Sequence, residues 1–273
     1  MYTTHKIILI VTFILFDYTS LLFGQCLDEN FAFKSGERLH YEVYYNWGFI
    51  WLNAGEAEFD VKTDTFKNKP VYFLDSYGSS YRGYDWIYKV RDSYRTYLDM
   101  KTLQPLWFHR NTYEGGYTVN NSYLFDQLNR RIISSSENSK KPLVKDTLKM
   151  KNCTYDVLSL IYLSRNLSFK DVKVNDTIPV TAVIDNEVYP LYIRYLGKDI
   201  METRDGHKYK CIKFSALLVE GTMFRGGEDL FVWITDDQNR IPVLVEAKIL
   251  VGSVKAMLAG SSGLRNPVTS KIE

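Results

Sequence analysis

Residues 39–45 read Leu-His-Tyr-Glu-Val-Tyr-Tyr, and residues 56–62 read Glu-Ala-Glu-Phe-Asp-Val-Lys. In both stretches apolar side chains occupy alternate positions, and most of the positions between them are charged or polar. A period of two residues is typical of a β-strand that buries one face and exposes the other. These two stretches therefore predict strands, and they decide the fold class.

Runs of the same β-rich character recur along the chain. Further strands are predicted over 71–77, 87–98, 106–113, 117–125, 131–135, 177–184, 188–196, 208–219, 229–234 and 242–251. Pairs of Gly, Asn or Asp at 115–116, 185–186, 205–206 and 226–227 join neighbouring runs, and these residues tolerate the positive φ of tight hairpins. Strands joined so tightly are antiparallel, and no regular strand–helix alternation indicates a parallel α/β sheet.

One segment departs from the β pattern. Thr154 or Asp156 can cap a helix that ends near Asn166. Its apolar residues approximate helical spacing, at Val157, Leu160, Ile161 and Leu163. Residues 134–145 are polar and are predicted to form an exposed, mobile loop. The predicted fold is mostly β: an antiparallel, strongly curved sheet, half-barrel or clam-like, or two half-sheets, with one main helix near 154–166 on the concave side.

The first residues have the features of a secretory signal peptide. Lys6 precedes an apolar run over 7–16, which Asp17 interrupts. This run is too short to span a bilayer. We therefore expect residues 1–24 to be a signal peptide and residues 25–273 to be a single exported β-rich domain in the periplasm or cell envelope. Two halves, 30–150 and 167–262, are the alternative division.

The three cysteines leave two questions open. Cys26 stands where a bacterial lipoprotein carries its lipid, but Gln25 before it is not the small residue that lipid-transferring enzymes prefer. An exposed thiol at Cys26 is therefore the favoured prediction. In an oxidising compartment Cys153 and Cys211 can form a disulfide, and the alternative is that all three thiols stay free.

Composition and motifs argue against several classes of function. Lys and Arg number 34 against 32 Asp and Glu, so the basic excess of a general nucleic-acid binder is missing. The sequence has no phosphate-binding loop, dinucleotide-binding glycine motif, zinc-protease motif or nucleophile elbow. We therefore predict a protein that is not an enzyme and has no cofactor or metal. The adjacent Asp236 and Asp237 are read either as a hydrolase acid/base pair or as a hairpin turn balanced by Arg240.

Aromatic residues make up 15% of the chain, and two stretches of them are not explained by strand alternation. Residues 47–52 are apolar on both strand faces, and residues 77–86 mix large aromatics with Gly and Ser, as binding loops do. Trp47, Trp51, Tyr81 and Trp86 are the predicted ligand contacts. The alternative is that both stretches are structural, as doubly buried strand and as an aromatic cluster over a sheet edge.

Several segments together resemble the bacterial exported proteins grouped as domain of unknown function 3108. They are 36–41, 53–57, 88–92, 98–99, 103–105, 123–126, 155–162 and 233–242, in that order along the chain. The resemblance implies a periplasmic β-rich protein without assigned activity, and it carries over no catalytic residue. A more distant similarity is to the half-barrels of periplasmic lipoprotein carriers and sensors, in which a sheet wraps a helix and can hold acyl chains.

We therefore expect a non-enzymatic envelope protein that binds an apolar or amphiphilic, lipid-like ligand, or an envelope partner, in the concavity of its sheet. Nucleic acid is not expected as a partner. The first alternative is a glycan-binding or structural surface module that uses exposed Tyr and Trp. The second alternative is a hydrolase that uses Asp236 and Asp237.

Overall fold

Strand β1 (Arg38–Trp47) connects the N-terminal and C-terminal parts of the sheet, because it pairs with one strand from each part. On one side it is hydrogen-bonded to β2 (Ile50–Phe66), which follows it, and on the other to β15 (Ser253–Ser262). Both pairings are antiparallel. The computed structural model describes residues 26, 29–47, 50–151, 153–219, 226–249 and 252–272. Residues 1–24, the predicted signal peptide, lie outside this part.

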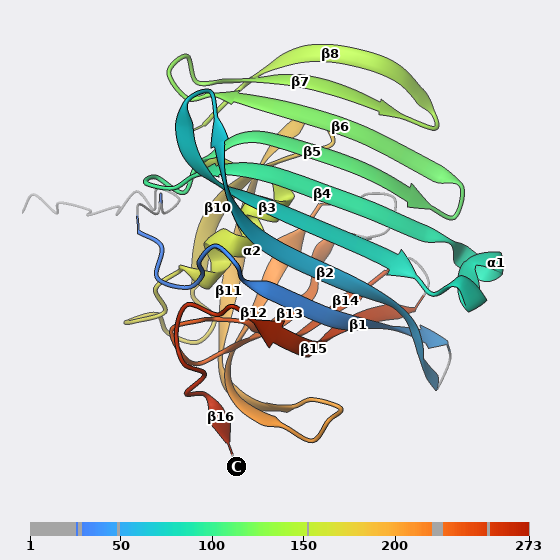
Figure 1. Cartoon of the computed structure of the whole chain (residues 1–273), viewed down its shortest axis with the longest axis vertical. Coiled ribbons are helices and arrows are strands. Elements are labelled where there is room, and N and C mark those ends of the chain that lie inside the picture. The colour runs from blue at the N-terminus through green and yellow to red at the C-terminus, as the bar shows by residue number, and fades with distance from the viewer. Residues whose placement is uncertain are drawn as a thin grey trace, which may run out of the picture.

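From β2 the sheet continues through consecutive hairpins to one edge at β8. These strands are β3 (Lys69–Ser80), β4 (Val90–Asp99), β5 (Pro105–Glu114), β6 (Tyr117–Asp126), β7 (Arg131–Asn138) and β8 (Lys141–Lys149). Between β3 and β4 lie a 3₁₀ turn, η1 (Arg82–Tyr84), and the single helical turn α1 (Asp85–Tyr88). Figure 1 shows this half of the sheet, with α1 at one end of its strands.

From β15 the sheet continues in the other direction to its second edge at β9. These strands are β14 (Pro242–Lys248), β13 (Gly227–Thr235), β12 (Lys208–Leu218), β11 (Glu187–Glu202), β10 (Thr177–Ile184) and β9 (Thr154–Tyr155), and the short β16 (Lys271–Ile272) pairs with β12. In the part of the chain that is described, β9–β10 is the one parallel pairing. The prediction of a mostly antiparallel β protein is confirmed, and the described strands form one open sheet rather than two half-sheets.

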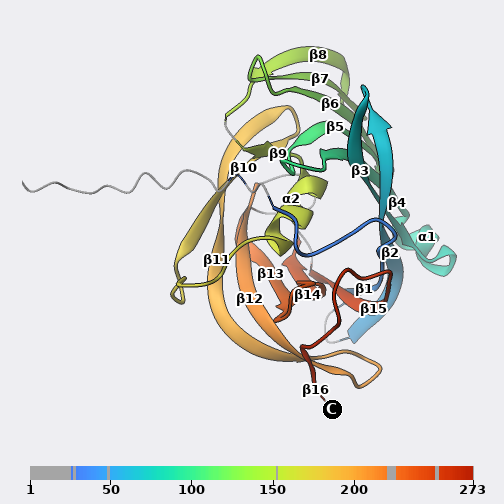
Figure 2. The same ribbon diagram turned by 60° about the vertical axis from the view of Figure 1, so that its left-hand side comes forward.

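Helix α2 (Val157–Arg165) lies between the two halves of the sheet and contacts β3, β4 and β10 (Figure 2). Asp156 caps it, since the carboxylate accepts hydrogen bonds from the backbone N–H groups of Leu158 and Ser159. Leu158 and Tyr162 pack into the core of the first half, and Leu163 packs into the core of the second. The predicted helix is confirmed, with Asp156 as the cap and Thr154 in β9.

Two local predictions are wrong. Residues 134–145 form most of the hairpin β7–β8 instead of a loop. Its turn is held by Asn138, whose Oδ1 accepts hydrogen bonds from the N–H groups of Lys140 and Lys141. The sequence looked like a loop because β8 is an edge strand, and edge strands carry Lys and Pro where an inner strand carries apolar residues. Residues 85–88, partly assigned to a strand, form α1, and the strand begins at Val90.

The structure also decides the pairing of the cysteines, which the sequence left open: Cys153 and Cys211 are not bonded to each other, and the favoured prediction of a free thiol at Cys26 is wrong. Cys26 is bonded to Cys153, and Cys211 is a buried free thiol on β12. The bridge ties the beginning of the described chain to the segment just before α2. Sequence reasoning missed it because the partners are 127 positions apart in the sequence and give no local signal.

Candidate functional site

The face of the sheet that contacts α2, here called the inner face, changes character from one half to the other. On β4, Thr96 donates a hydrogen bond to the capping residue Asp156, which fixes Thr96, Tyr94 and Asp92 as inner residues. The pairing register then joins Asp92 to Gly78 on β3, and Gly78 to Ala57 on β2. The middle of this inner row is therefore formed by small residues. A Cβ added to Gly78 would have its nearest neighbour, a backbone oxygen, at 3.9 Å.

At one end of these rows lies a group of polar residues, the inner polar cluster, formed by Asp92, Tyr94, Arg110, Thr112 and Glu114. The Arg110 guanidinium carbon lies 5.8 Å from the centre of the Tyr94 ring. Asp92 Oδ1 accepts a hydrogen bond of 3.3 Å from the Tyr113 N–H. Glu114 is 5% exposed. Five polar side chains thus occupy core-facing positions of two neighbouring strands.

Burial controls the protonation of the two carboxyl groups. Desolvation, with a contribution from the charge of Glu114, raises the pKa of Asp92 to about 7. Desolvation also raises the pKa of Glu114 above its ordinary value, although the nearby Arg110 charge opposes the shift. Asp92 can therefore donate as well as accept hydrogen bonds near neutral pH.

The tip of the β10–β11 hairpin crosses onto this cluster from the other half of the sheet. Arg110 Nη1 lies 3.0 Å from Asp185 Oδ1, and the N–H of Asn186 donates a hydrogen bond of 3.1 Å to the Tyr123 hydroxyl. The predicted turn at 185–186 is confirmed, and both of its residues have positive φ. Within the described residues, Arg110 Nε and Thr112 Oγ1 are buried without a hydrogen-bond partner. Such groups are uncommon in native proteins, so each of the two calls for a specific explanation.

The other half of the inner face is apolar. Its half-buried members, here called the inner apolar wall, are Ala216, Leu230, Val245, Val254 and Ala256. Three of them, Ala216, Leu230 and Val245, pack partly against the second core cluster beside α2. Ala256 pairs with Val43, which pairs with Gly55, so the wall joins the small inner residues of β2 without a break in the sheet.

The predicted contact residues lie toward the end of the sheet that carries α1, and Trp51 does not face the inner side. Trp51 has the Lys255 ammonium 4.3 Å above its ring, and Lys255 shares the outer face with Met257. Tyr81 directly precedes η1, and burial, with a contribution from the charges of Glu56 and Glu42, raises its pKa. Trp86 lies on α1 and is 83% exposed. Trp47 ends β1, and its side chain lies outside the described residues.

A register shift explains the orientation of Trp51. Between Val43 and Tyr44 the partner on β2 changes from Gly55 to Asn53, so Ala54 forms a bulge. Uninterrupted alternation from Gly55 would put Trp51 on the inner face. The extra residue turns it to the outer face.

The paired carboxylates at Asp236 and Asp237 are engaged in structural contacts. Asp236 Oδ2 lies 2.8 Å from Lys198 Nζ. Asp237 Oδ1 accepts hydrogen bonds from Thr235 and Asn239, and its Oδ2 accepts from the Ser270 hydroxyl at 2.8 Å. Both residues line a cavity of about 450 Å³ beside Phe31 and Arg240. The contacts agree with the hairpin interpretation, and the hydrolase interpretation stays an untested prediction.

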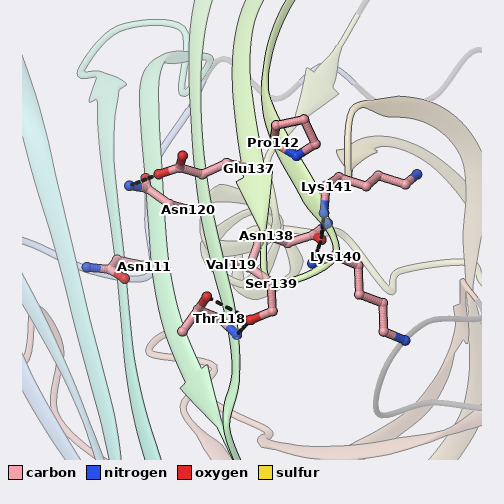
Figure 3. A pocket seen from close by; sticks show the side chains of 10 residues that line it. All are labelled: Asn111, Thr118, Val119, Asn120, Glu137, Asn138, Ser139, Lys140, Lys141 and Pro142. Carbon is pink, nitrogen blue, oxygen red and sulfur yellow. Dashed lines mark hydrogen bonds between the residues drawn. The ribbon is translucent and has the colours of Figure 1, made fainter.

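The outer face of the first half carries a row of aromatic rings, here called the outer aromatic stripe. Its members are Phe66, Phe73, Tyr97, Trp107 and His109, with neighbouring ring centres 4.9 to 5.8 Å apart. His109 Nε2 lies 3.1 Å from Asn120 Oδ1, and Asn120 donates to Glu137 at 3.2 Å. Asn120 and Glu137 line a polar cavity of about 510 Å³ that extends to the β7–β8 turn (Figure 3). The stripe therefore leads into a cavity of amide, hydroxyl, carboxylate and ammonium groups.

The inner polar cluster has a signal in the sequence, an alternation of polar residues on two neighbouring strands, that the predictions above did not include. Asp92, Tyr94 and Thr96 alternate on β4, and Arg110, Thr112 and Glu114 alternate on β5. On each strand this face continues into buried apolar residues at Leu98 and Phe108. Ionisable residues that continue a core-facing alternation indicate a functional interior, because burying them without a role costs stability.

In the part of the chain that the structure describes, no helix is long and apolar enough to cross a bilayer. No group of three or more His, Cys, Asp or Glu side chains in this part is placed to hold a metal ion.

Comparisons with known proteins address the fold and the family. A solved structure, described as a beta-barrel-like protein of domain of unknown function DUF1849 from Brucella abortus, superposes with a TM-score of 0.54 at 10% identity. The match covers 85% of this chain and 99% of that one, so it shows a shared fold. None of the curated proteins matches the chain. The family model described as protein of unknown function (DUF3108) matches residues 40–259, so the chain belongs to this family.

Proposed function

We propose that this protein binds an amphiphilic, lipid-like ligand on the inner face of a strongly curved, half-barrel sheet, as a non-enzymatic component of the periplasm or cell envelope. One observation carries the proposal: toward the α1 end, the inner face is polar on β4 and β5, carries the small residues Ala57 and Gly78 on β2 and β3, and is apolar on β12 to β15. An amphiphile needs these three surfaces in this order, for its head group, its passage across the sheet and its chain.

The apolar part of the ligand is stabilised by removal from water. Each methylene buried against the inner apolar wall contributes about 0.8 kcal/mol. Helix α2 and the two core clusters fill the inner side next to β3, β4 and β10, so the ligand lies beyond the helix, where wall residues such as Leu230 and Val254 stay half-exposed. Because Gly78 has no side chain and Ala57 has only a methyl group, no large side chain stands on the sheet between the inner apolar wall and the inner polar cluster at this pair.

Charge decides the class of head group. Arg110 is the cluster's guanidinium and is already paired with Asp185, whereas Asp92 and Glu114 have no cationic partner among the described ion pairs. A free carboxylate or phosphate on the ligand would add negative charge beside these acids. A neutral, hydroxyl-bearing head or a cationic amine is therefore favoured, since a hydroxyl can donate hydrogen bonds to the two carboxyl groups or accept them, and an ammonium can donate to them.

The test combines the natural ligand with chemical probes. Native mass spectrometry of protein purified from its own envelope is expected to detect a co-purified amphiphile. In titrations at pH 8, a dansyl-labelled fatty amine is expected to bind at least ten-fold more tightly than the dansyl-labelled fatty acid of equal length. Protonation of Asp92 at pH 5 is expected to reduce this preference.

Two substitutions on adjacent residues separate the inner face from the outer. Gly78→Leu puts an isobutyl group into the open space on the inner face and is expected to weaken probe binding at least ten-fold. Tyr77→Leu changes the exposed outer neighbour and is expected to leave binding unchanged. If neither probe binds and nothing co-purifies, or if Gly78→Leu binds as the wild type does, the proposal fails.

A second candidate function is glycan binding on the outer face, and the outer aromatic stripe favours it. Sugar rings present apolar C–H faces to aromatic side chains and hydroxyl edges to amides and carboxylates, and the stripe leads from rings to Asn120 and Glu137. Glycan-array binding that is lost in Trp107→Ala and kept in Trp86→Ala would support this candidate. Binding that depends on Tyr81 and Trp86 would instead support the location predicted from the sequence.

A further inference from the structure

The α1 end of the sheet exposes apolar surface that the inner site does not use. Trp86, Ile87 and Tyr88 form the single turn α1 and are 83%, 45% and 47% exposed. Tyr113, at the end of β5, is exposed beside them. These four residues, here called the α1 patch, occupy one end of the sheet (Figure 1). Side chains of this size exposed together mark an interaction surface.

The charge around the α1 patch is positive. Arg82 and Lys89 flank α1 and are exposed, and the Lys89 ammonium lies 5.4 Å from the centre of the Tyr113 ring. The acid on α1, Asp85, is bound by Arg91 through contacts of 2.6 and 3.1 Å. Arg82 and Lys89 are therefore left to interact with an external negative charge.

The α1 patch also lies at the rim of the inner polar cluster. The Tyr88 ring packs on Gly115, where a Cβ would lie 2.2 Å from ring atom Cε2. Burial and the charges of Glu114 and Asp92 raise the pKa of Tyr88. One face of α1 is thus fixed against the sheet beside the cluster, while Trp86 and Ile87 project away from it.

We infer that the α1 patch docks the protein onto a membrane surface that carries anionic lipids. Tryptophan and tyrosine prefer the boundary between head groups and acyl chains, and lysine and arginine add attraction to anionic head groups. This combination of exposed aromatic, aliphatic and basic side chains matches a bilayer surface better than a purely polar partner. Docking by α1 would bring the rim of the inner face to the membrane, but it does not depend on the inner ligand.

The experiment is co-sedimentation of the whole mature protein with large vesicles, either of phosphatidylcholine alone or with one third phosphatidylglycerol. The wild type is expected to bind the anionic vesicles and to bind the neutral ones at least ten-fold more weakly. Trp86→Ser with Ile87→Ser is expected to reduce binding at least ten-fold. The matched control is Leu128→Ser, which removes a side chain that is 96% exposed at the β6–β7 turn, at the opposite end of the sheet.

A second pair of variants tests the basic residues. Arg82→Gln and Lys89→Gln are each expected to weaken binding to anionic vesicles roughly five-fold, and to lose this effect in high salt. Brominated lipids are expected to quench the fluorescence of the wild type more than that of Trp86→Phe, which places the indole in the bilayer interface. Gly78→Leu is expected to dock as the wild type does, so failure of the inner site and failure of docking are distinguishable.

Three outcomes would overturn the inference. The first is that no protein sediments with anionic vesicles. The second is that Leu128→Ser loses as much binding as the Trp86 and Ile87 variant. The third is that the protein self-associates in light scattering and Trp86→Ser abolishes this self-association but not sedimentation, which would assign the patch to a second copy of the chain.

Discussion

Arg165 and Glu37 form an ion pair that is sealed inside the protein, with side chains 1% and 0% exposed. The guanidinium binds both carboxylate oxygens, at 2.6 and 2.9 Å. It also donates to the carbonyl oxygen of Asn239. The last residue of α2 is thereby connected to the segment before β1 and to the turn after β13. The pair locks the helix between the two halves of the sheet.

Removing one partner of this pair is expected to destabilise the protein strongly. Glu37→Gln leaves the Arg165 charge buried without a counter-charge, at a cost of about 3–5 kcal/mol in the free energy of unfolding. Urea denaturation of the wild type and the variant measures the difference. Arg38→Met, which breaks an exposed pair with Asp60, is the matched control and is expected to cost less than about 1 kcal/mol. Equal effects of the two substitutions would contradict this role of the pair.

The half-buried acid Asp92 is expected to make stability depend on pH. Its pKa is about 7 in the folded protein and near 3.8 in the unfolded chain. Below pH 4 the group is protonated in both states. As pH rises from 4 to 7 the unfolded chain ionises first, so folding stability falls, by about 1.4 kcal/mol for each unit of difference in pKa at most. Above pH 7 the contribution is constant.

Asp92→Asn isolates this effect. The variant is expected to show a smaller loss of unfolding free energy between pH 4.5 and 8 than the wild type, measured by urea denaturation at both values. Part of the loss stays, because burial also raises the pKa of Asp156 to about 6. Asp75→Asn, on the outer face of β3, is expected to keep the wild-type pH profile. A pH profile of Asp92→Asn that is identical to that of the wild type would contradict the raised pKa of Asp92.

The cysteines make a third prediction. Native protein is expected to show no reactive thiol, because Cys26 is bonded to Cys153 and burial raises the pKa of Cys211 to about 12. Unfolding without a reductant is expected to release one thiol, and unfolding with a reductant three. Cys26→Ser opens a loop of 127 residues and is expected to lower stability by about 4–5 kcal/mol. Two reactive thiols in the native state would be incompatible with this pairing.

Local sequence patterns were sufficient for most strands and for the helix. Alternation in residues 39–45 and 56–62 gave most of β1 and the middle of β2, because each strand has one buried and one exposed face. Thr154 and Asp156 were the two candidate caps for α2, because a side-chain cap is a local interaction, and the structure selects Asp156. The hairpin turn at 185–186 could also be predicted locally, because Asp185 and Asn186 are residue types that accept positive φ.

Features set by long-range packing could not be read in the same way. The bulge at Ala54 reverses the face of Trp51, and its sequence does not differ from that of an ordinary strand. The pairing of β1 with β15 joins the two halves of the sheet. Residues 253–262, which form β15, nevertheless show no strong alternation of apolar and polar side chains. The candidate site was missed for a related reason: Asp92 and Glu114 meet only because β4 and β5 pair in register, and each looks like a surface residue alone.

The two glycines on the inner face of β2 and β3 give the last prediction, because they differ in the space around them. A Cβ at Gly55 would lie 2.3 Å from the backbone oxygen of Ser79, which cannot move without breaking the pairing of β2 with β3. Gly55→Ala is therefore expected to lower the free energy of unfolding by at least the roughly 1–3 kcal/mol that is usual for overpacking.

Gly78→Ala meets open space and has an ordinary strand conformation, so it is expected to be neutral or to stabilise the protein by about 0.4–1 kcal/mol through the unfolded chain. Urea denaturation of both variants compares the two sites directly. A large loss in Gly78→Ala would mean that other parts of the protein fill the inner face at this point. In that case Gly78→Leu would fail to fold rather than block a ligand, so this comparison also decides whether the binding experiment is interpretable.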